Sequence, residues 1–291
     1  MPADVEQLIG LLQLERRGPD LFIGAADTWT TRQRVFGGHV LAQALTAGYQ
    51  TVPDDRYAHS LSAYFVRGGL AGVPIEYRVE EVRDGGSFST RRVVASQNGR
   101  SIFFMAGSFH ELEPGLNHAD TIPAGVPAPQ ECPALSEVLG ARSRRTAEAW
   151  RQEFGVLETR FASDTSAVSA ASRADARMQV WVRAESALPS DPRLHQAVLA
   201  YASDLTLLAV STVPHPVVFG GPGMQAASIN HAMWFHRPAR ADQWLLYDQV
   251  SPSASAGLGF SFGRLFSGGQ LAASCAQEGL IRLTDPAAIV D

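Results

Sequence analysis

The two halves of this 291-residue sequence repeat one another at a constant spacing of 170 positions, the distance from Phe65 to Phe235. The segment SAYFVR at 62–67 resembles the segment AMWFHR at 232–237. The residues that coincide at this spacing are Phe65 and Phe235, Arg67 and Arg237, Tyr77 and Tyr247, and Gly99 and Gly269. The repetition predicts two similar structural units, and it requires a fold in which two such units pack together.

Each half begins with a predicted helix and continues with predicted antiparallel strands. The helices are expected at 37–50 (GGHVLAQALTAGYQ) and at 193–210 (RLHQAVLAYASDLTLLAV). Strand-like segments flank Asn98-Gly99, which is a strong hairpin signal, and also flank Gly268-Gly269. A helix that lies against an antiparallel sheet, repeated twice, indicates the α+β class. Two such units side by side complete each other's sheet and protect its edges.

The composition changes between the two halves. Residues 113–133 are rich in proline and glycine, which indicates a surface connection, and residues 134–154 are expected to be helical. Strand-like alternation then resumes at 178–184 (MQVWVRA). The predicted organisation is an N-terminal repeat at 1–115, a linker at 116–175 and a C-terminal repeat at 176–291.

The composition also excludes several classes of function. All 24 basic residues are arginine, so neither a Schiff-base lysine nor a P-loop lysine is present. A formal net charge of −5 gives no electrostatic reason to expect nucleic acid as a partner. Cys132 and Cys275 are too few for a disulfide framework, which favours a reducing, cytoplasmic location. No apolar run is long enough for a membrane span, and the histidines lack the spacing of metal ligands.

The second predicted helix contains one aspartate within an apolar stretch, YASDLTLL at 201–208. At helical spacing Tyr201, Leu205 and Leu208 belong to one apolar stripe, and Asp204 lies on or beside that stripe. A buried carboxylate must be protonated, hydrogen-bonded or in contact with trapped water. The alternative is that Asp204 lies at the margin of the stripe and simply reaches solvent.

Two further polar residues occur in apolar, strand-like segments. In LAASCAQEGLI, alternation places Gln277 on the same face as Ala273 and Cys275, as expected where a helix packs closely on a sheet. In MQAASINHAMWF, the more apolar face contains Ile229, which places Ser228 on the opposite face. Alternation alone therefore does not decide whether Ser228 faces the helix, and a hydroxyl bonded to a neighbouring carbonyl is the simpler interpretation.

Several segments, in the same order along the chain, resemble the acyl-CoA thioesterase II family. They are VFGGHVLAQAL, VEEVRDGGSFSTRRVVASQNGRSIFFMAGSF, LHQAVLAYASDL, NHAMWFHRP and QEGLIR, and only the linker at 116–175 lies outside the resemblance. The resemblance implies a double hotdog fold, two helix-in-sheet repeats in one chain. It also implies hydrolysis of acyl-CoA to free fatty acid and CoA without a metal, a cofactor or a covalent acyl-enzyme, in a protein that forms homo-oligomers.

The resemblance further implies a catalytic group of Asp204, Ser228 and Gln277. The family usually has threonine where this sequence has Ser228, which keeps the hydroxyl but loses a methyl group that restricts the rotamer. Thioester hydrolysis by direct attack needs a positioned water, a proton acceptor and a donor to the developing oxyanion. Asp204 is expected to take the proton of that water, while Ser228 and Gln277 hold the water and the carboxylate.

The first predicted helix begins with tandem glycines in FGGHV. Gly37 and Gly38 let a ligand approach the backbone N–H groups of the helix start. We expect both glycines, with His39 and with Tyr201 of the second helix, to contribute to substrate binding, although close packing of a helix on a sheet would need the same glycines. The first helix contains no acidic residue, so the second repeat alone is expected to be catalytic.

Other functions fit single features of the sequence. GFSFG at 259–263 matches the serine-hydrolase motif, but a strand is expected there and no histidine follows His236. A nucleophilic Cys275 would need a base, and none is evident. DPRLHQ at 191–196 is the nearest match to the catalytic loop of hotdog enoyl-CoA hydratases. A non-catalytic acyl-CoA-binding protein is the remaining alternative.

Overall fold

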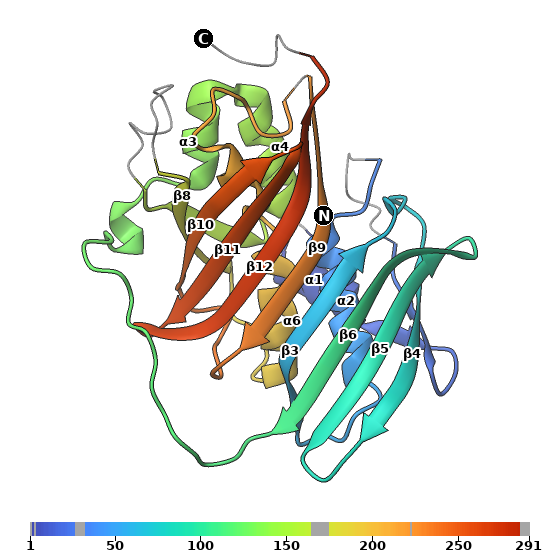
Figure 1. Cartoon of the computed structure of the whole chain (residues 1–291). Coiled ribbons are helices and arrows are strands. Elements are labelled where there is room, and N and C mark those ends of the chain that lie inside the picture. The colour runs from blue at the N-terminus through green and yellow to red at the C-terminus, as the bar shows by residue number, and fades with distance from the viewer. Residues whose placement is uncertain (1, 3, 27–32, 164–174, 222, 286–291) are drawn as a thin grey trace.

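The computed structural model describes residues 2, 4–26, 33–163, 175–221 and 223–285. Within these residues, twelve strands form one antiparallel sheet, and helices α1, α2 and α6 lie on the face that is turned away from the viewer in Figure 1. The strand order is β1-β2-β4-β5-β6-β3-β9-β12-β11-β10-β8-β7. The expected α+β class is therefore confirmed. None of the described helices is long and apolar enough to cross a membrane.

Each half of the chain contains one central helix followed by four long strands. The N-terminal half consists of α1 (Val5–Leu12), β1 (Leu14–Arg16), β2 (Leu21–Gly24), α2 (Gly37–Tyr49), β3 (Arg56–Phe65), β4 (Ile75–Asp84), β5 (Phe88–Gln97) and β6 (Arg100–Glu111). The C-terminal half consists of β8 (Arg177–Ala184), α6 (Pro192–Ser203), a 3₁₀ helix (Leu208–Thr212), β9 (Met224–Phe235), β10 (Leu245–Ser255), β11 (Leu258–Ser267) and β12 (Gln270–Leu283). The order β2-α2-β3-β4-β5-β6 thus recurs as β8-α6-β9-β10-β11-β12.

The two hairpins predicted from glycine-containing turns are present. Asn98 and Gly99 join β5 to β6 with φ values of 51° and 71°, and Gly268 and Gly269 join β11 to β12 with values of 55° and 83°. A two-residue turn with positive φ at both positions matches the twist of the strands it connects. These turns occupy equivalent places in the two repeats, as the spacing of 170 positions predicts.

Strands β3 and β9 join the two repeats into one sheet. They pair antiparallel from Ser60 opposite Trp234 to Tyr64 opposite Asn230. Helices α2 and α6 pack against each other on the inner face of this junction. The hydroxyl of Tyr49 at the end of α2 donates to the side chain of Gln196 in α6. Each repeat therefore covers an edge and a helix flank that the other would leave exposed.

The second central helix is shorter than predicted. We expected it to continue to residue 210, but α6 ends at Ser203, and Asp204 caps it with φ −90° and ψ 0°. The chain then turns and forms the 3₁₀ helix at Leu208–Thr212 before β9 begins. The apolar pattern continued because the turn is also buried, with Leu207 and Leu208 at most 5% exposed. Burial, rather than helical geometry, accounts for the apolar residues after Asp204.

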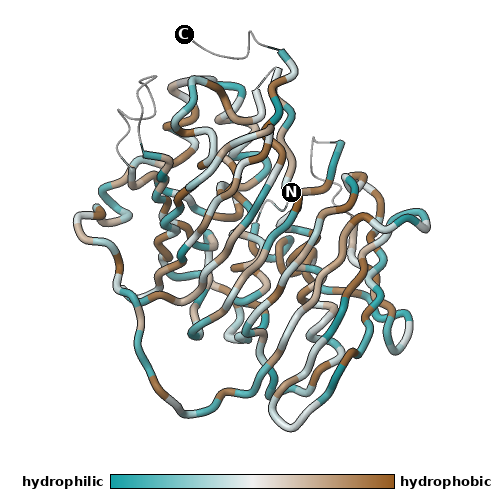
Figure 2. Tube along the Cα trace, in the orientation of Figure 1, coloured by the Kyte–Doolittle hydropathy of each residue, from teal (hydrophilic) through white to brown (hydrophobic). Residues whose placement is uncertain are grey.

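The segment between the repeats contributes to the fold. It contains a short 3₁₀ helix (Pro129–Glu131), α3 (Leu135–Arg142), α4 (Arg144–Phe154) and β7 (Leu157–Phe161), the last of which pairs with β8. The single predicted helix at 134–154 is divided at Ser143, whose side chain caps α4. Figure 2 shows that hydrophilic and hydrophobic residues alternate along the connection after β6 before the chain reaches these helices.

Candidate active site

A β-bulge decides which way Ser228 faces. Asn230 pairs with Glu278 of β12, but Ser228 pairs with the next residue, Gly279, so Ile229 is an extra residue in β9. A bulge shifts the alternation of its strand by one residue and is common beside active sites. Ser228 therefore lies on the inner face, together with His231, and not on the face opposite the helices. The bulge therefore explains why the alternation of polar and apolar residues in β9 did not decide which face Ser228 occupies.

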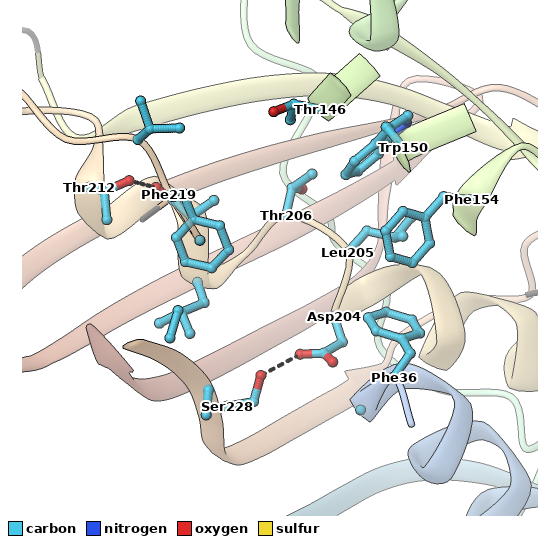
Figure 3. Close-up of a pocket in the computed structure, with 18 of the residues that line it drawn as sticks. Phe36, Thr146, Trp150, Phe154, Asp204, Leu205, Thr206, Thr212, Phe219 and Ser228 are labelled. Carbon is cyan, nitrogen blue, oxygen red and sulfur yellow. Dashed lines mark hydrogen bonds between the residues drawn. The ribbon is translucent and has the colours of Figure 1, made fainter. Parts of the chain in front are cut away.

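The three predicted catalytic side chains meet beneath the end of α6. The hydroxyl of Ser228 donates to Oδ1 of Asp204 over 2.9 Å (Figure 3). Nε2 of Gln277 donates both to Oδ1 of Asp204 and to Oγ of Ser228, each over 2.5 Å. Asp204 belongs to the end of α6, Ser228 to β9 and Gln277 to β12, so the fold assembles residues that are up to 73 positions apart.

The carboxyl group of Asp204 is unusually basic. Asp204 is 8% exposed, and burial raises its pKa to about 6, because water no longer stabilises the charged form. The hydrogen bonds from Gln277, from Ser228 and from the backbone N–H of Gly38 act in the opposite direction and lower the pKa. At neutral pH the group is ionised, yet it is a stronger base than an exposed aspartate. These are the properties expected of a general base.

The start of helix α2 approaches Asp204 closely. A Cβ atom added to Gly37 would lie 2.5 Å from Oδ2 of Asp204, so only glycine fits at this position. A side chain at Gly38 would collide with the carbonyl oxygen of Tyr201. The tandem glycines of the first repeat therefore serve the carboxylate of the second repeat, and the partly positive N-terminus of α2 faces that carboxylate.

The four residues predicted to bind substrate lie near the site in different environments. Gly37 lines the cavity described below, and Gly38 contacts the carboxylate of Asp204. His39 is fully buried in α2, and the ring of Tyr201 packs edge-on against Phe36 with centroids 5.2 Å apart. Neither His39 nor Tyr201 is among the residues that line the cavity. A role of these two residues in substrate binding stays a prediction.

A large, mostly apolar cavity opens onto Asp204 and Ser228. Its volume is about 2000 Å³. Several parts of the chain supply its walls, among them the first repeat, the two linker helices, and the turn after Asp204. Residues that line it include Phe36, Gly37 and Phe65 from the first part, Leu139, Trp150 and Phe154 from the second, and Leu205, Thr206 and Phe219 from the third (Figure 3).

Sequence reasoning missed the contribution of the linker to this cavity. Helices α3 and α4 lie outside the segments that resemble the thioesterase family, and we assigned them no function. Leu139, Trp150 and Phe154 nevertheless line the cavity, and Figure 3 shows Trp150 and Phe154 on the same side of it as Leu205. The apolar residues of α4 at 147, 150 and 154 follow helical spacing, which predicts a buried face but does not reveal what that face covers.

The motifs that suggested a serine hydrolase, a cysteine nucleophile or a hydratase contribute to the fold and not to the site around Asp204. Ser261 of GFSFG lies in the middle of β11, fully buried, and another strand follows it. Cys275 is buried, and its pKa is raised to about 12 by burial, so it does not form a thiolate at neutral pH. In the hydratase-like segment, Asp191 caps α6 and Nδ1 of His195 accepts a hydrogen bond from the backbone N–H of Ala241.

Models of one protein family match both halves of the chain. A model described as acyl-CoA thioesterase matches residues 156–280, and a model described as acyl-CoA thioesterase N-terminal domain matches residues 25–110. Acyl-coenzyme A thioesterase 8 of Mus musculus is 36% identical over 94% of this chain and 88% of the mouse protein. Acyl-CoA thioesterase 2 of Haemophilus influenzae is 35% identical over 97% of this chain and 99% of that protein.

Solved structures agree with the sequence relatives. The acyl-CoA thioesterase II TesB2 of Mycobacterium marinum is 38% identical and superposes with a TM-score of 0.79 over 96% of this chain and 98% of that chain. A hot dog fold protein from Alicyclobacillus acidocaldarius is 19% identical, with a TM-score of 0.75 over 95% and 98% of the two chains. The predicted double hotdog fold is thereby confirmed, and the chain belongs to the acyl-CoA thioesterase II family.

Proposed function

We propose that this protein hydrolyses fatty acyl-CoA to a free fatty acid and CoA by direct attack of water on the thioester. The observation that carries the proposal is the meeting of a basic, buried carboxylate with a large apolar cavity. The cavity offers room for an acyl chain, and Asp204 lies where the chain would end in its thioester. Membership of the acyl-CoA thioesterase II family supports the same reaction.

In this mechanism Asp204 accepts a proton from the attacking water. The water oxygen bonds to the thioester carbon, and the carbon–sulfur bond then breaks. The departing CoA thiolate takes up the proton that Asp204 accepted, which returns Asp204 to its carboxylate form. Ser228 and Gln277 direct their hydrogen bonds to the same oxygen, Oδ1 of Asp204, which leaves Oδ2 for the water. Gln277 is fully buried and does not line the cavity, so we assign it to holding the carboxylate and the serine hydroxyl.

The start of helix α2 provides donors for the developing oxyanion. Gly37 lines the cavity beside Asp204, and the first N–H groups of a helix have no partner within the helix. We therefore keep Gly37 as a substrate-binding residue and assign Gly38 to the carboxylate. Arg34 and Arg67 are exposed residues that also line the cavity and offer positive charge to the phosphates of CoA.

The two alternative functions are not favoured. A hydratase would need the pair Asp191 and His195 at the substrate, but both are engaged in holding the start of α6 and its neighbouring loop. A passive acyl-CoA-binding protein would have no need of a carboxylate held by three donors. The repeat boundaries at 115 and 176, the cytoplasmic location and the assembly into homo-oligomers stay our predictions.

Release of free thiol tests the proposal. Purified protein is mixed with acyl-CoAs of graded chain length, and CoA is titrated with a chromogenic disulfide. We expect Asp204→Asn to lower kcat/KM by about 10²- to 10⁴-fold, the usual contribution of a general base. Glu278→Gln, next to Gln277 in β12 but on the other face of the sheet, is the matched control and should retain its rate. Near-wild-type turnover of Asp204→Asn would refute the role of Asp204, and no thiol from any chain length would refute hydrolysis.

A further inference from the structure

Gln277 has a fully buried polar residue directly opposite it on each neighbouring strand. His231 of β9 pairs with it on one side, and Ser261 of β11 pairs with it on the other. All three are 0% exposed. Side chains at directly opposed positions on one face of an antiparallel sheet lie close enough to interact. A row of polar residues thus crosses the sheet beneath Asp204, and the mechanism above uses only one of its members.

The hydrogen bonds of Gln277 fix which end of its amide faces Asp204. Nε2 has two hydrogens, and both are used, one by Oδ1 of Asp204 and one by Oγ of Ser228. The reversed amide would place its carbonyl oxygen against a carboxylate oxygen, which is repulsive. In the observed orientation Oε1 of Gln277 is buried and has no hydrogen-bond partner among the residues that the structure describes. A buried carbonyl oxygen in this situation requires a donor.

Oγ of Ser261, on one side of Gln277, is buried without a partner among the described residues, and on the other side the ring of His231 carries a polar atom that matches Oε1. Its Nδ1 is also buried without a partner in the described part of the chain, while its Nε2 lies 2.9 Å from Oγ of Ser203 at the end of α6. Burial lowers the pKa of His231 to about 4, and its contact with Gln277 acts in the opposite direction, as an acceptor beside a ring N–H does. The ring is therefore neutral at physiological pH and carries its single proton on one of the two nitrogens.

We propose that His231 is a positioning residue for the thioesterase reaction, because its Nδ1–H donates to Oε1 of Gln277 and holds the amide with its nitrogen toward Asp204. This inference rests on the proposed function. Nε2 then accepts from the hydroxyl of Ser203, which also lies 2.9 Å from the carbonyl oxygen of Ala200 and rotates from that acceptor to the ring. The resulting chain of hydrogen bonds runs from Ser203 through His231 and Gln277 to Asp204.

The consequence concerns turnover more than binding. His231 does not line the cavity, so its loss leaves the acyl-binding surface unchanged. Without the ring, the Gln277 amide is free to reverse, and its carbonyl oxygen then faces the carboxylate of Asp204. That arrangement disfavours the charged form of Asp204 and moves Oδ1 away from Ser228. We therefore expect a lower kcat and an acidic limb of the pH–rate profile that lies at higher pH.

The kinetic test compares His231→Leu with Ser261→Ala, because both residues are buried and flank Gln277 on opposite sides. We expect His231→Leu to lower kcat by about 10- to 100-fold, the range found when a partner that orients an active group is lost. KM should change less than about twofold, and the acidic limb should move upward. His231→Gln, which keeps an N–H donor, should recover part of the rate. Ser261→Ala should keep its rate, and the reverse pattern would assign the donor to Ser261 and overturn the proposal.

A double-mutant cycle and the tautomer give independent checks. In the Gln277→Ala background, His231→Leu should have no further effect on kcat, whereas full multiplication of the two losses would contradict positioning through Gln277. Nitrogen-15 NMR of labelled wild-type protein should show a neutral His231 with its proton on Nδ1, and a proton on Nε2 would overturn the proposal even if His231→Leu fails to fold. Absence of thiol release by the wild type would instead refute the proposed function. The tautomer measurement would still show whether Nδ1–H of His231 can donate to Oε1 of Gln277.

Discussion

At the scale of single residues, burial of Asp204 costs folding free energy, and the same burial gives it the properties of the general base that we propose. A buried carboxylate is unfavourable unless hydrogen bonds replace the water it loses. Gln277, Ser228 and the N–H of Gly38 replace it only in part, because the pKa of Asp204 remains raised to about 6. The protein therefore keeps a charged group at neutral pH in a place where a neutral one would be more stable. Such a residue is expected at a functional site.

The pH dependence of stability tests this interpretation. Between about pH 4 and pH 6 the folded state keeps a proton on Asp204 that the unfolded state releases, so stability is lost as the pH rises through this window. The difference of about two pKa units corresponds to about 2–3 kcal/mol. We expect the free energy of unfolding of Asp204→Asn, relative to the wild type, to increase by about that amount between pH 4 and pH 8 in urea titrations.

The change with pH is the readout here, because the substitution also replaces one carboxyl oxygen by an NH₂ group, and the effect of that replacement on the variant is the same at every pH. Asp120→Asn, at an exposed position in the linker, is the control and should show a much smaller change. A difference between Asp204→Asn and the wild type that stays constant from pH 4 to pH 8 would show that Asp204 is not strained by burial.

At the scale of secondary-structure elements, features set by residues adjacent in the chain could be predicted from the sequence, and features set by tertiary contacts could not. The hairpins at Asn98-Gly99 and Gly268-Gly269 and the start of α2 were predicted, because each depends on residues that are adjacent in the chain. The end of α6 at Ser203 was not, since the turn after it is stabilised by residues of β9 and β12. The bulge at Ile229 was likewise hidden, because it exists only relative to its partner strand.

The candidate site shows the same division. Asp204, Ser228 and Gln277 were named from the family resemblance, and the structure brings them together within 2.9 Å of one another. Alternation correctly placed Gln277 on the inner face but left the face of Ser228 undecided, because the bulge at Ile229 interrupts the pattern. No sequence pattern indicated that the linker helices reach the cavity, because cavity walls are formed by apolar faces that look like any other core-facing stripe.

Helices α3 and α4 are expected to determine which acyl chains fit. Leu139 of α3 lines the cavity, so Leu139→Trp should fill space that a long chain needs and a short chain does not. We expect kcat/KM for long-chain acyl-CoA to fall by about tenfold relative to short-chain acyl-CoA, as measured by thiol release across a chain-length series. Ser136→Trp, on the same helix but away from the cavity, is the control. Equal losses for all chain lengths in Leu139→Trp would assign α3 a structural role only.

At the scale of the whole molecule, two repeats build one site. The second repeat provides Asp204, Ser228 and Gln277, while the first provides the start of α2 at Gly37. The first central helix has no carboxylate at its own end, and only six residues separate α2 from β3 where twenty separate α6 from β9. The longer connection carries the turn that lines the cavity. Divergence of the two repeats thus accounts for the single catalytic group that we propose in a symmetric fold.

The face of the sheet opposite the central helices carries exposed aromatic side chains. Tyr64 and Phe104 stack on this face at the junction of the repeats, with ring centroids 5.4 Å apart. Trp234 of the adjacent strand β9 and Phe262 of β11, two strands further on, are also exposed. Apolar side chains gathered on one face indicate an interaction surface. Because a two-fold interface brings the same surface of two copies together, we expect a second copy of this chain to cover this apolar face, as in a symmetric dimer.

Light scattering after size exclusion should therefore show a dimer or a larger assembly for the wild type, and Trp234→Glu should shift it toward the monomer. A charge placed in a desolvated interface opposes association, since the partner offers it no counter-charge. Thiol release should persist in Trp234→Glu, because the cavity lies on the other side of the sheet. Leu116→Glu, at a fully exposed linker position, should leave the assembly unchanged. A wild type that stays monomeric at micromolar concentration would mean that this face serves no interaction between copies of the chain.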